Sequence, residues 1–465
     1  MINSIIHFFY PNIKPEETKK FTLLAVIFFF IIGTYWLLRL LKNTIFLKVA
    51  FPECLGWGPQ QGCLFQPIAK FLSPFIVLVM ILIYSKLVDL VKKHQLFYII
   101  CSFYACIFSL CAAILFLKDV HGPEYLGKAS LAAMGWLSYF TIESFGSLVV
   151  ALFWSFSNSI TDSEAAKRGF PFIFAVAQMA AILGSSLLFF SGSIGSLWPI
   201  LLLASALVAA VIPLVRYFMD TVPPEQMVGN IAASATEKKK EGFWEGFISG
   251  LVLLFSRSYL LGVLVLSTFY EAIAQIIEYQ MQMYASTSAA YSGELAFAQF
   301  QSAYGMSINL VSFLIALLGT SYFIKQFGTQ IALLIYPLSF AVTLISLFTF
   351  FQFGASPAAL LWATFATMIF IKGIGYAVNN PTKEIMYIPT SKDAKFKSKG
   401  WIDTFGSRFA KAGGAQVTNT FKHSMSQLMV FGALFGFGLI GVWLIAALFV
   451  GFKNKKLLEE NKIIE

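Results

Sequence analysis

Long apolar runs, each of about 20 residues or more, follow one another along almost the whole chain. A helix needs about 20 such residues to cross the hydrocarbon core of a bilayer. Only 12% of the 465 residues are charged, whereas an ordinary soluble domain carries about 25%. The pattern predicts an all-α integral membrane protein and excludes a soluble enzyme, a disordered chain and a coiled coil. The alternating ten-residue segments of a membrane β-barrel are missing from the sequence.

Twelve membrane spans are expected from these runs. The eleventh, DTFGSRFAKAGGAQVTNTFKHS, is too polar to face lipid and is expected to pack inside a bundle or to line water. Several spans exceed 25 residues, which indicates tilt or extension beyond the lipid. The predicted spans are 21–45, 70–91, 96–117, 129–157, 169–191, 196–217, 248–284, 294–324, 329–352, 357–380, 403–425 and 427–451.

The longest polar stretch between spans covers residues 218–246 and contains two prolines and the run Lys238–Lys240. It divides the chain into an N-terminal half (1–217) and a C-terminal half (247–465), with six predicted spans in each. Two halves related by a pseudo-repeat are a common plan among transporters. Direct residue identity between the halves is too weak to demonstrate the repeat.

Charge placement predicts the orientation in the membrane. The formal net charge is +10, and in a membrane protein this excess first indicates topology and lipid headgroups rather than nucleic acid. With the N-terminus inside, twenty Lys and Arg residues fall on inner segments and five on outer segments. Both termini are therefore expected in the cytoplasm, because Lys and Arg collect on cytoplasmic loops. The five outer residues are Lys48, Lys70, Lys118, Lys128 and Lys422.

The five cysteines and the first residues of the chain allow further structural predictions. The cysteines at 101, 106 and 111 lie in an apolar run and are expected to be packing residues. Cys54 and Cys63 share an outer loop and can form a disulfide if that loop faces an oxidising compartment, which leaves both states open. No Cys or His cluster has metal-ligand spacing. Residues 2–10 have the composition of a short interfacial helix that ends at Pro11.

Ionisable residues inside the spans point to function, because each is costly in lipid unless it is paired or hydrated. For any single one, a structural ion pair or a snorkelling side chain is an equal explanation. Together, however, the cations outnumber the carboxylates, and this favours a water-filled cavity that receives an anion. Arg39 and Lys42 share a helix face by their spacing, as do Glu271 and Glu278. The full set is Arg39, Lys42, Glu143, Glu271, Glu278, Lys372, Lys383, Arg408 and Lys411, with Asn158, Gln178, Gln275, Asn379 and Asn380 as polar companions.

Four stretches of this sequence resemble one known family. They are LLRLLKNT (37–44), ESFGSL and LFWSFSN (within 143–158), AAKRGFP (165–171) and NPTKEIMYIPTSKDAKFKSKGWIDTFGSRFAKAGGA (380–415). Through them the chain resembles the nucleotide transporters, or ATP/ADP translocases, of plastids and obligate intracellular bacteria. The resemblance implies twelve helices in a major-facilitator-like 6+6 bundle around a central cavity, and nucleotide exchange by alternating access.

The resemblance also implies site residues. Four charged positions that matter in the family are matched by Lys42, Glu143, Glu278 and Lys411, and Gln178 falls where some members carry a polar residue linked to phosphate co-transport. Three departures weaken an assignment to strict ATP/ADP exchange: Asn43 and Asn380 replace the usual Asp, and the usual Trp and Lys are replaced in EYQMQMYAS after Glu278. The predicted substrate-site residues are Arg39, Lys42, Glu143, Asn158, Gln178, Glu278, Lys383 and Lys411.

The predicted function is nucleoside di- and triphosphate antiport, most simply ATP for ADP, across the inner membrane of an intracellular bacterium. The alternative is a proton-coupled nucleotide or NAD importer of the same family. Glu143 and Glu278 are expected either to pair with the cations as gates or to carry a proton. No cofactor, metal or nucleic acid is predicted, the expected partners are nucleotides and the lipid bilayer, and a monomer is expected. An enzyme is disfavoured because no histidine accompanies a nucleophile or acid cluster.

Overall fold

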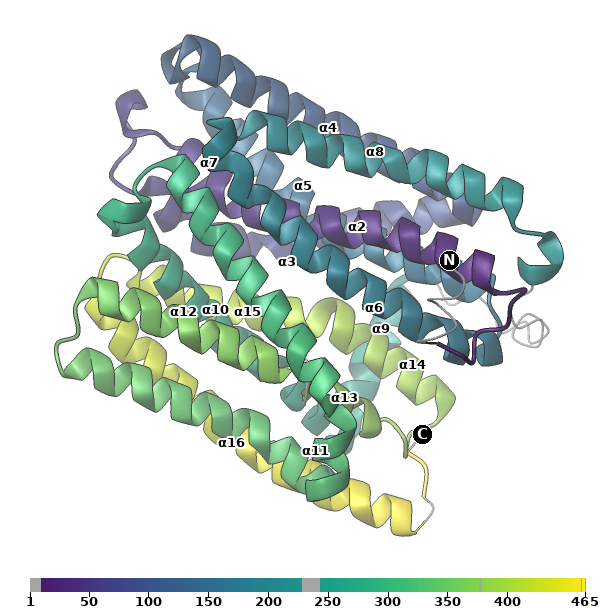
Figure 1. Cartoon of the computed structure of the whole chain (residues 1–465). Coiled ribbons are helices and arrows are strands. Elements are labelled where there is room, and N and C mark those ends of the chain that lie inside the picture. Colours follow the sequence, from purple (N-terminus) through teal and green to yellow (C-terminus); the bar gives the residue numbers. More distant parts are fainter. Residues whose placement is uncertain (1–9, 228–242, 376–378, 461, 465) are drawn as a thin grey trace. The chain divides into compact units, whose positions relative to one another are not determined.

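The computed structural model describes residues 10–227, 243–375, 379–460 and 462–464, and these ranges contain helices and no β-strand. The expectation of an all-α fold is confirmed, and Figure 1 shows the long helices. The predicted interfacial helix at 2–10 and most of the 218–246 linker, with Lys238–Lys240, lie outside the described residues.

The described helices follow one another along the chain. The longer ones are α2 (Thr18–Thr44), α3 (Gln61–Leu90), α4 (Lys93–His121), α5 (Pro123–Ser159), α6 (Ser163–Leu187), α8 (Trp198–Thr221), α9 (Phe243–Ser256), α10 (Ser258–Thr287), α11 (Glu294–Gln352), α12 (Pro357–Ile374), α14 (Lys392–Trp401), α15 (Ser407–Phe421) and α16 (Met425–Glu459). Two short helices are α7 (Ser191–Ile194) and α13 (Asn380–Ile385), and π-helical turns follow α2 at Ile45–Val49 and precede α15 at Ile402–Gly406.

Two compact units divide the chain. The first holds residues 1–61, 76–240 and 293–306, and the second holds 62–75, 241–292 and 307–465. The division at 240 falls within the predicted linker. Each unit also includes a 14-residue segment from the other half of the sequence, which the sequence does not reveal: 62–75 from α3 and 293–306 from α11.

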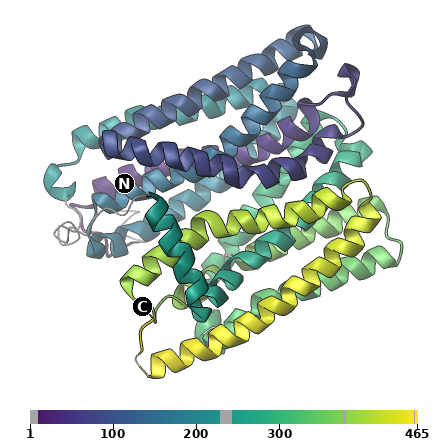
Figure 2. The same ribbon diagram turned by 180° about the vertical axis from the view of Figure 1, so that it is seen from behind.

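The two units repeat one packing pattern. In the first unit α2 packs against α5, α6 and α8, and in the second unit α10 packs against α12, α15 and α16. Figure 1 shows α4 alongside α8 within the first unit, and Figure 2 shows α16 of the second unit in yellow from behind. In each unit one apolar helix, α2 or α10, thus packs against three others. Helix α10 is the more buried of the two, since 72% of the residues in its most apolar 18-residue stretch are buried.

Ten helices in the described residues are long and apolar enough to cross a membrane. They match ten of the twelve predicted spans. The other two, 294–324 and 403–425, are helical, but the first includes residues whose side chains are not described and the second is the polar one noted above. The chain is a multi-pass membrane protein, and the count of twelve spans stays a prediction.

Backbone breaks shift some predicted boundaries. The predicted span 248–284 is two helices, because Arg257 has an extended backbone (φ −118°, ψ 105°) between α9 and α10. Helix α11 runs through both predicted spans 294–324 and 329–352, and Gly328 within it has a left-handed φ of +74°. A left-handed φ of this kind favours glycine, since it has no Cβ to clash.

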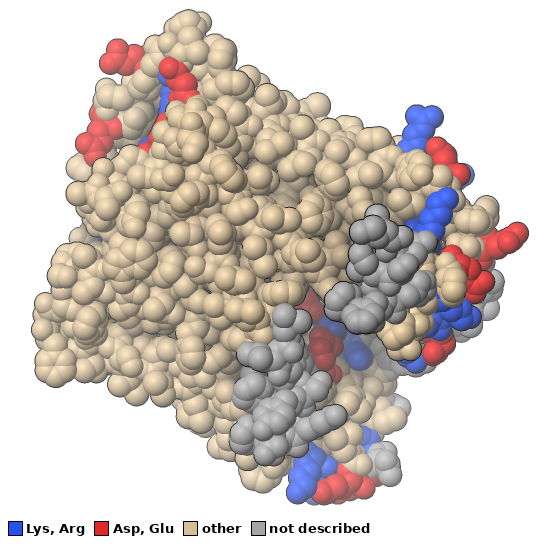
Figure 3. Space-filling view, viewed as in Figure 1, with Lys and Arg blue, Asp and Glu red and all other residues tan. Residues whose placement is uncertain are grey.

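Charged side chains lie mainly at the ends of the helices. On the face drawn in Figure 3, Lys, Arg, Asp and Glu gather near the helix ends, and other residues form the flanks. Lipid solvates apolar flanks and headgroups solvate charges, so this distribution is the one a bilayer stabilises. The charges inside the units are consequently exceptional.

Candidate functional site

Lys42 and Glu143 form an ion pair inside the first unit. The Lys42 ammonium donates to Oε1 of Glu143, which joins α2 to α5. Lys42 is only 3% exposed and also lies 4.6 Å above the centre of the Tyr139 ring. A carboxylate on one side and a π-face on the other replace the water that a buried ammonium loses.

Arg39 lies one turn before Lys42 on the same face of α2. Its guanidinium is 4.9 Å from the centre of the Trp36 ring, and the residue is half-buried. Arginine stacks well on aromatic rings because its planar cation is weakly hydrated. The stack places a second cation one helical turn from Lys42.

Glu271 is shared by two cations in the second unit. Its Oε2 lies 3.5 Å from Nζ of Lys372 on α12 and 3.5 Å from Nζ of Lys411 on α15. The side chain of Glu271 is 11% exposed, and those of Lys372 and Lys411 are 15% and 39% exposed. Both contacts are longer than a short charge-assisted hydrogen bond, which spans about 2.7–2.9 Å. The cluster carries one net positive charge.

Helix α10 brings Glu271 to these cations with one polar face. Four polar residues on it, spaced by four, three and four positions, fall within about 60° of one another around the helix axis. They are Glu271, Gln275, Glu278 and Gln282. Gln275 and Gln282 are buried, and Gln282 accepts a hydrogen bond from Gln66 within the second unit.

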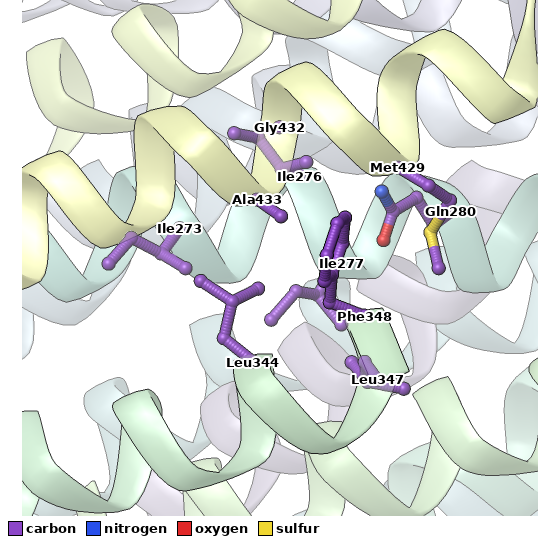
Figure 4. Close-up of a pocket in the computed structure, with 10 residues that line it drawn as sticks. All are labelled: Ile273, Ile276, Ile277, Gln280, Leu344, Leu347, Phe348, Met429, Gly432 and Ala433. Carbon is purple, nitrogen blue, oxygen red and sulfur yellow. The ribbon is translucent and has the colours of Figure 1, made fainter. Parts of the chain in front are cut away.

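The opposite face of α10 is apolar and closely packed. Figure 4 shows Ile273, Ile276 and Ile277 directed toward side chains of α11 and α16 around a small cavity of about 10 Å³. This face anchors α10 in the second unit. The polar face is therefore turned toward α12 and α15.

A polar cavity of about 70 Å³ adjoins the Glu271 cluster. Its lining is Tyr270, Glu271, Tyr336, Lys372, Gly375 and Asn380. A Cβ at Gly375 would lie 2.6 Å from the Tyr336 hydroxyl, so glycine leaves room for that group. The cavity has room for several water molecules.

Four further predicted site residues are distributed over both units. In the first unit, Asn158 is exposed near the end of α5 and Gln178 is half-buried in α6. In the second unit, Lys383 is half-buried in the last turn of α13, and Glu278 is half-buried two turns after Glu271. The roles predicted for these four residues stay predictions.

Sequence reasoning listed Glu271 and Lys372 as membrane charges but did not place them in the site. The structure pairs Glu271 with both Lys411 and Lys372. A signal was available: Glu271 follows Lys42 by 229 positions, and Lys372 follows Glu143 by the same number. Both pairs join the corresponding helices of their units, with the signs of the charges exchanged.

The same spacing recurs elsewhere. Asp162 caps the start of α6, and Ser391, 229 positions later, caps the start of α14. Gly146 and Gly375, three residues after Glu143 and Lys372, are again 229 apart. The spacing links residues with equal structural tasks, which supports the internal repeat.

Cys54 and Cys63 are both free thiols, Cys54 exposed and Cys63 buried. Within the described ranges, no group of three or more His, Cys, Asp and Glu side chains is placed to hold a metal ion. The cations of the two clusters, which belong to lysine and arginine, can recognise an anion through charge-assisted hydrogen bonds.

Known proteins resemble this chain along most of its length. The ADP,ATP carrier protein 1 of Chlamydia pneumoniae is 27% identical over 507 residues, covering 97% of this chain and 94% of that protein. The ADP,ATP carrier protein 1 of Rickettsia bellii (strain RML369-C) is 25% identical over 458 residues, covering 88% and 87%. The chloroplastic ADP,ATP carrier protein 2 of Arabidopsis thaliana is 24% identical, covering 97% and 77%.

Solved structures show the fold. A POT family transporter in complex with 5-aminolevulinic acid has a TM-score of 0.63 at 13% identity, covering 94% of this chain and 96% of that chain. A D-xylose-proton symporter has a TM-score of 0.58 at 13% identity, covering 92% and 96%. The major-facilitator-like fold is thereby confirmed. Residues 1–453 match the family described as TLC ATP/ADP transporter, and the chain belongs to that family.

Proposed function

We propose that this chain exchanges ATP for ADP across a membrane by alternating access. The observation that carries the proposal is the pairing of lysines with carboxylates inside the two helical units, Lys42 with Glu143 and Lys411 with Glu271, in a member of the TLC ATP/ADP transporter family. Relatives named ADP,ATP carrier proteins support adenine nucleotides as the substrates. Lysine and arginine bind phosphate through charge-assisted hydrogen bonds.

Lys42 and Lys411 are the proposed phosphate-binding residues, with Arg39 beside Lys42. A carboxylate next to the phosphates would repel a polyanionic nucleotide. Glu143 therefore serves as the partner of Lys42 when phosphate is absent, and the arriving phosphate displaces it. A ligand can change the state of its carrier only through such differential contacts.

The proposed setting is the cytoplasmic membrane of a bacterium, with both termini in the cytoplasm and a monomer as the working unit. The charge count of twenty inner against five outer Lys and Arg residues supports this orientation. The protein moves its substrates without chemical change, in keeping with a carrier family.

The test is transport by purified protein in proteoliposomes. Vesicles loaded with ADP should take up labelled ATP, and vesicles without internal nucleotide should take up far less. Labelled GTP, UTP and NAD are offered in parallel, with and without an inward proton gradient. Uptake of any of these into empty vesicles that follows the proton gradient would replace the exchanger with the proton-coupled importer.

A further inference from the structure

We propose that Glu271 competes with substrate phosphate for Lys411, and that Lys372 holds Glu271 when phosphate has taken Lys411. This inference rests on the proposed function and assigns two further residues to it. Glu271 is thus an internal substitute for one phosphate oxygen. Lys372 is a positioning residue, since it acts through Glu271.

The geometry separates the two lysines. Both lie 3.5 Å from the same Glu271 oxygen, but the Lys411 side chain is 39% exposed and that of Lys372 is 15% exposed. A ligand that enters through water meets Lys411 first. Lys372 remains behind Glu271, where it can keep the carboxylate neutralised.

The shared arrangement lowers the cost of the exchange. A buried carboxylate that loses its only cation is strongly destabilised, because nothing replaces its hydration. Glu271 loses one of two cations and keeps the other. The adjoining 70 Å³ polar cavity, with Tyr270, Tyr336 and Asn380 in its lining, gives the displaced carboxylate room to turn and to be hydrated.

Comparison with the first unit shows what is special in the second. The pair Lys42 and Glu143 corresponds to Glu271 and Lys372 at the 229-residue spacing, with the charges exchanged. Lys411 has no charged counterpart, because the position 229 residues earlier is Ile182. The repeat thus supplies the Glu271–Lys372 pair, and Lys411 is an addition that only the second unit has at this spacing.

The test measures two variants with opposite expected signs. Without the competing carboxylate, Glu271→Gln should bind ADP about tenfold more tightly, equivalent to about 1.4 kcal/mol. Without its second cation, Glu271 should hold Lys411 more strongly, so Lys372→Gln should bind ADP about tenfold more weakly. Binding is measured by calorimetry in detergent at two salt concentrations.

Flux into nucleotide-free vesicles separates competition from a general effect of charge. Glu271→Gln should raise the ratio of this net flux to exchange, because the unloaded carrier loses the ion pair between Glu271 and Lys411. Lys372→Gln should lower the same ratio. Glu17→Gln is the matched control, since Glu17 is a half-buried carboxylate paired with Arg168 in the first unit. It should leave both the affinity and the ratio unchanged.

Equal affinities and equal flux ratios in wild type and both variants would overturn the inference, as would weaker binding in both variants. If Glu271→Gln does not fold, an unchanged Lys372→Gln overturns it alone. A different failure belongs to the proposed function: wild-type protein that exchanges no nucleotide. Opposite shifts in ADP binding would then still support competition at Lys411.

Discussion

Lys42 and Glu143 place two opposite charges between apolar helices, where neither has enough water to stand alone. Lys42 is 3% exposed, and the Glu143 side chain is 18% exposed. Removing one partner of a buried pair costs about 3–5 kcal/mol, whereas replacing both costs much less. The pair therefore adds little net stability when intact, but the loss of one partner alone is costly.

We predict that Lys42→Gln and Glu143→Gln each lower the melting temperature more than the double variant does. In a thermodynamic cycle, the sum of the two single losses should exceed the double loss by more than about 3 kcal/mol, because each single loss alone is larger than the double loss. The measurement is thermal unfolding in detergent followed by tryptophan fluorescence. Additive losses would mean that the ion pair contributes no coupling. In transport, Lys42→Gln should also lower apparent nucleotide affinity by about tenfold or more, because a charge-assisted contact is lost.

Asp162 gives a prediction outside the spans. Its carboxylate accepts hydrogen bonds from the backbone N–H groups of Ala165 and Glu164, both at 2.9 Å, at the start of α6. The bond from Ala165, more than any other contact, lowers the pKa of Asp162 below its usual value. A lowered folded-state pKa stabilises the protein above the ordinary pKa, and this contribution disappears as the pH falls through the folded-state pKa.

Asp162→Ala should therefore cost about 1 kcal/mol of stability at pH 7. The difference in stability between Asp162→Ala and wild type should shrink below about pH 4, where the wild-type Asp162 carboxylate becomes protonated. Asp162→Asn is the control: it can still cap the helix but does not titrate, so it should stay close to wild type at pH 7. The measurement is the melting temperature of each variant across pH 3–8. A loss of stability in Asp162→Ala that does not change with pH would contradict the prediction.

At the residue scale, sequence reasoning found the important cations because a lysine in an apolar run is conspicuous. For the carboxylates that pair with the site cations it named Glu143 and Glu278, and it did not name Glu271. Glu271 and Glu278 share a face of α10, so spacing treats them alike. The choice depends on the depth at which α10 and α15 cross, and more than 100 residues separate these helices in sequence. The structure places Glu271 there.

Helix α10 shows how one element carries two tasks. Its apolar face, with Ile273, Ile276 and Ile277, packs against α11 and α16, while its polar face carries Glu271. A helix that is apolar on one side and polar on the other is easily assigned to lipid when only its mean hydropathy is read. In its most apolar 18-residue stretch, however, 72% of the residues are buried inside the protein, so most of this helix does not face lipid.

Close approach of α10 and α15 depends on Gly414. A Cβ there would overlap the carbonyl oxygen of Ala272, the residue after Glu271, whereas a Cβ at Gly413 would meet no atom within 4 Å. Backbone cannot move aside as a flexible side chain can. The contact fixes the depth at which Lys411 reaches Glu271.

We predict that Gly414→Ala lowers stability by about 1–3 kcal/mol, the usual range for overpacking. Gly413→Ala, its neighbour, should be neutral or stabilising by up to about 1 kcal/mol, because alanine favours helix. Melting temperature and apparent ADP affinity are measured for both. Equal behaviour of the two variants would show that the helices do not depend on this contact.

At the element scale, hydropathy located the spans but missed the breaks. The sequence FISGLVLLFSRSYLLGVLVL is apolar on both sides of Arg257, so its mean hydropathy hides the change of backbone direction between α9 and α10. At Gly328 the opposite happened: the prediction separated the spans 294–324 and 329–352, whereas the structure has one helix, α11, with a left-handed φ of +74° at this glycine. Boundaries depend on backbone angles that composition does not report.

For the whole molecule, orientation is testable by labelling. We predict that a single cysteine at Glu124 reacts with an impermeant thiol reagent from outside, and that single cysteines at Lys167 and Lys453 react only after permeabilisation. All three residues are exposed. The background variant lacks all five native cysteines. Outside labelling at Lys167 or Lys453 would invert the proposed topology.

The internal repeat was visible in the sequence only as a six-plus-six division. Residue identity between the halves is too low to align them, because lipid-facing positions accept many apolar side chains. The spacing of 229 residues becomes meaningful only when Lys42 is seen with Glu143, and Glu271 with Lys372. The repeat is therefore preserved in the contacts between helices rather than in the identities of the amino acids.

The segment 293–306, which belongs to the first unit, has a consequence for biosynthesis. Ser302 donates a hydrogen bond to the Ser185 carbonyl at 2.6 Å, and Lys118 pairs with Glu294 at 2.7 Å. These contacts cannot form when residue 240 has just been translated. The ribosome must add about 66 more residues, which takes roughly 3 to 13 s at 5–20 residues per second. During that interval the N-terminal half lacks its contacts with the segment 293–306, and it is accessible to insertion chaperones and membrane proteases.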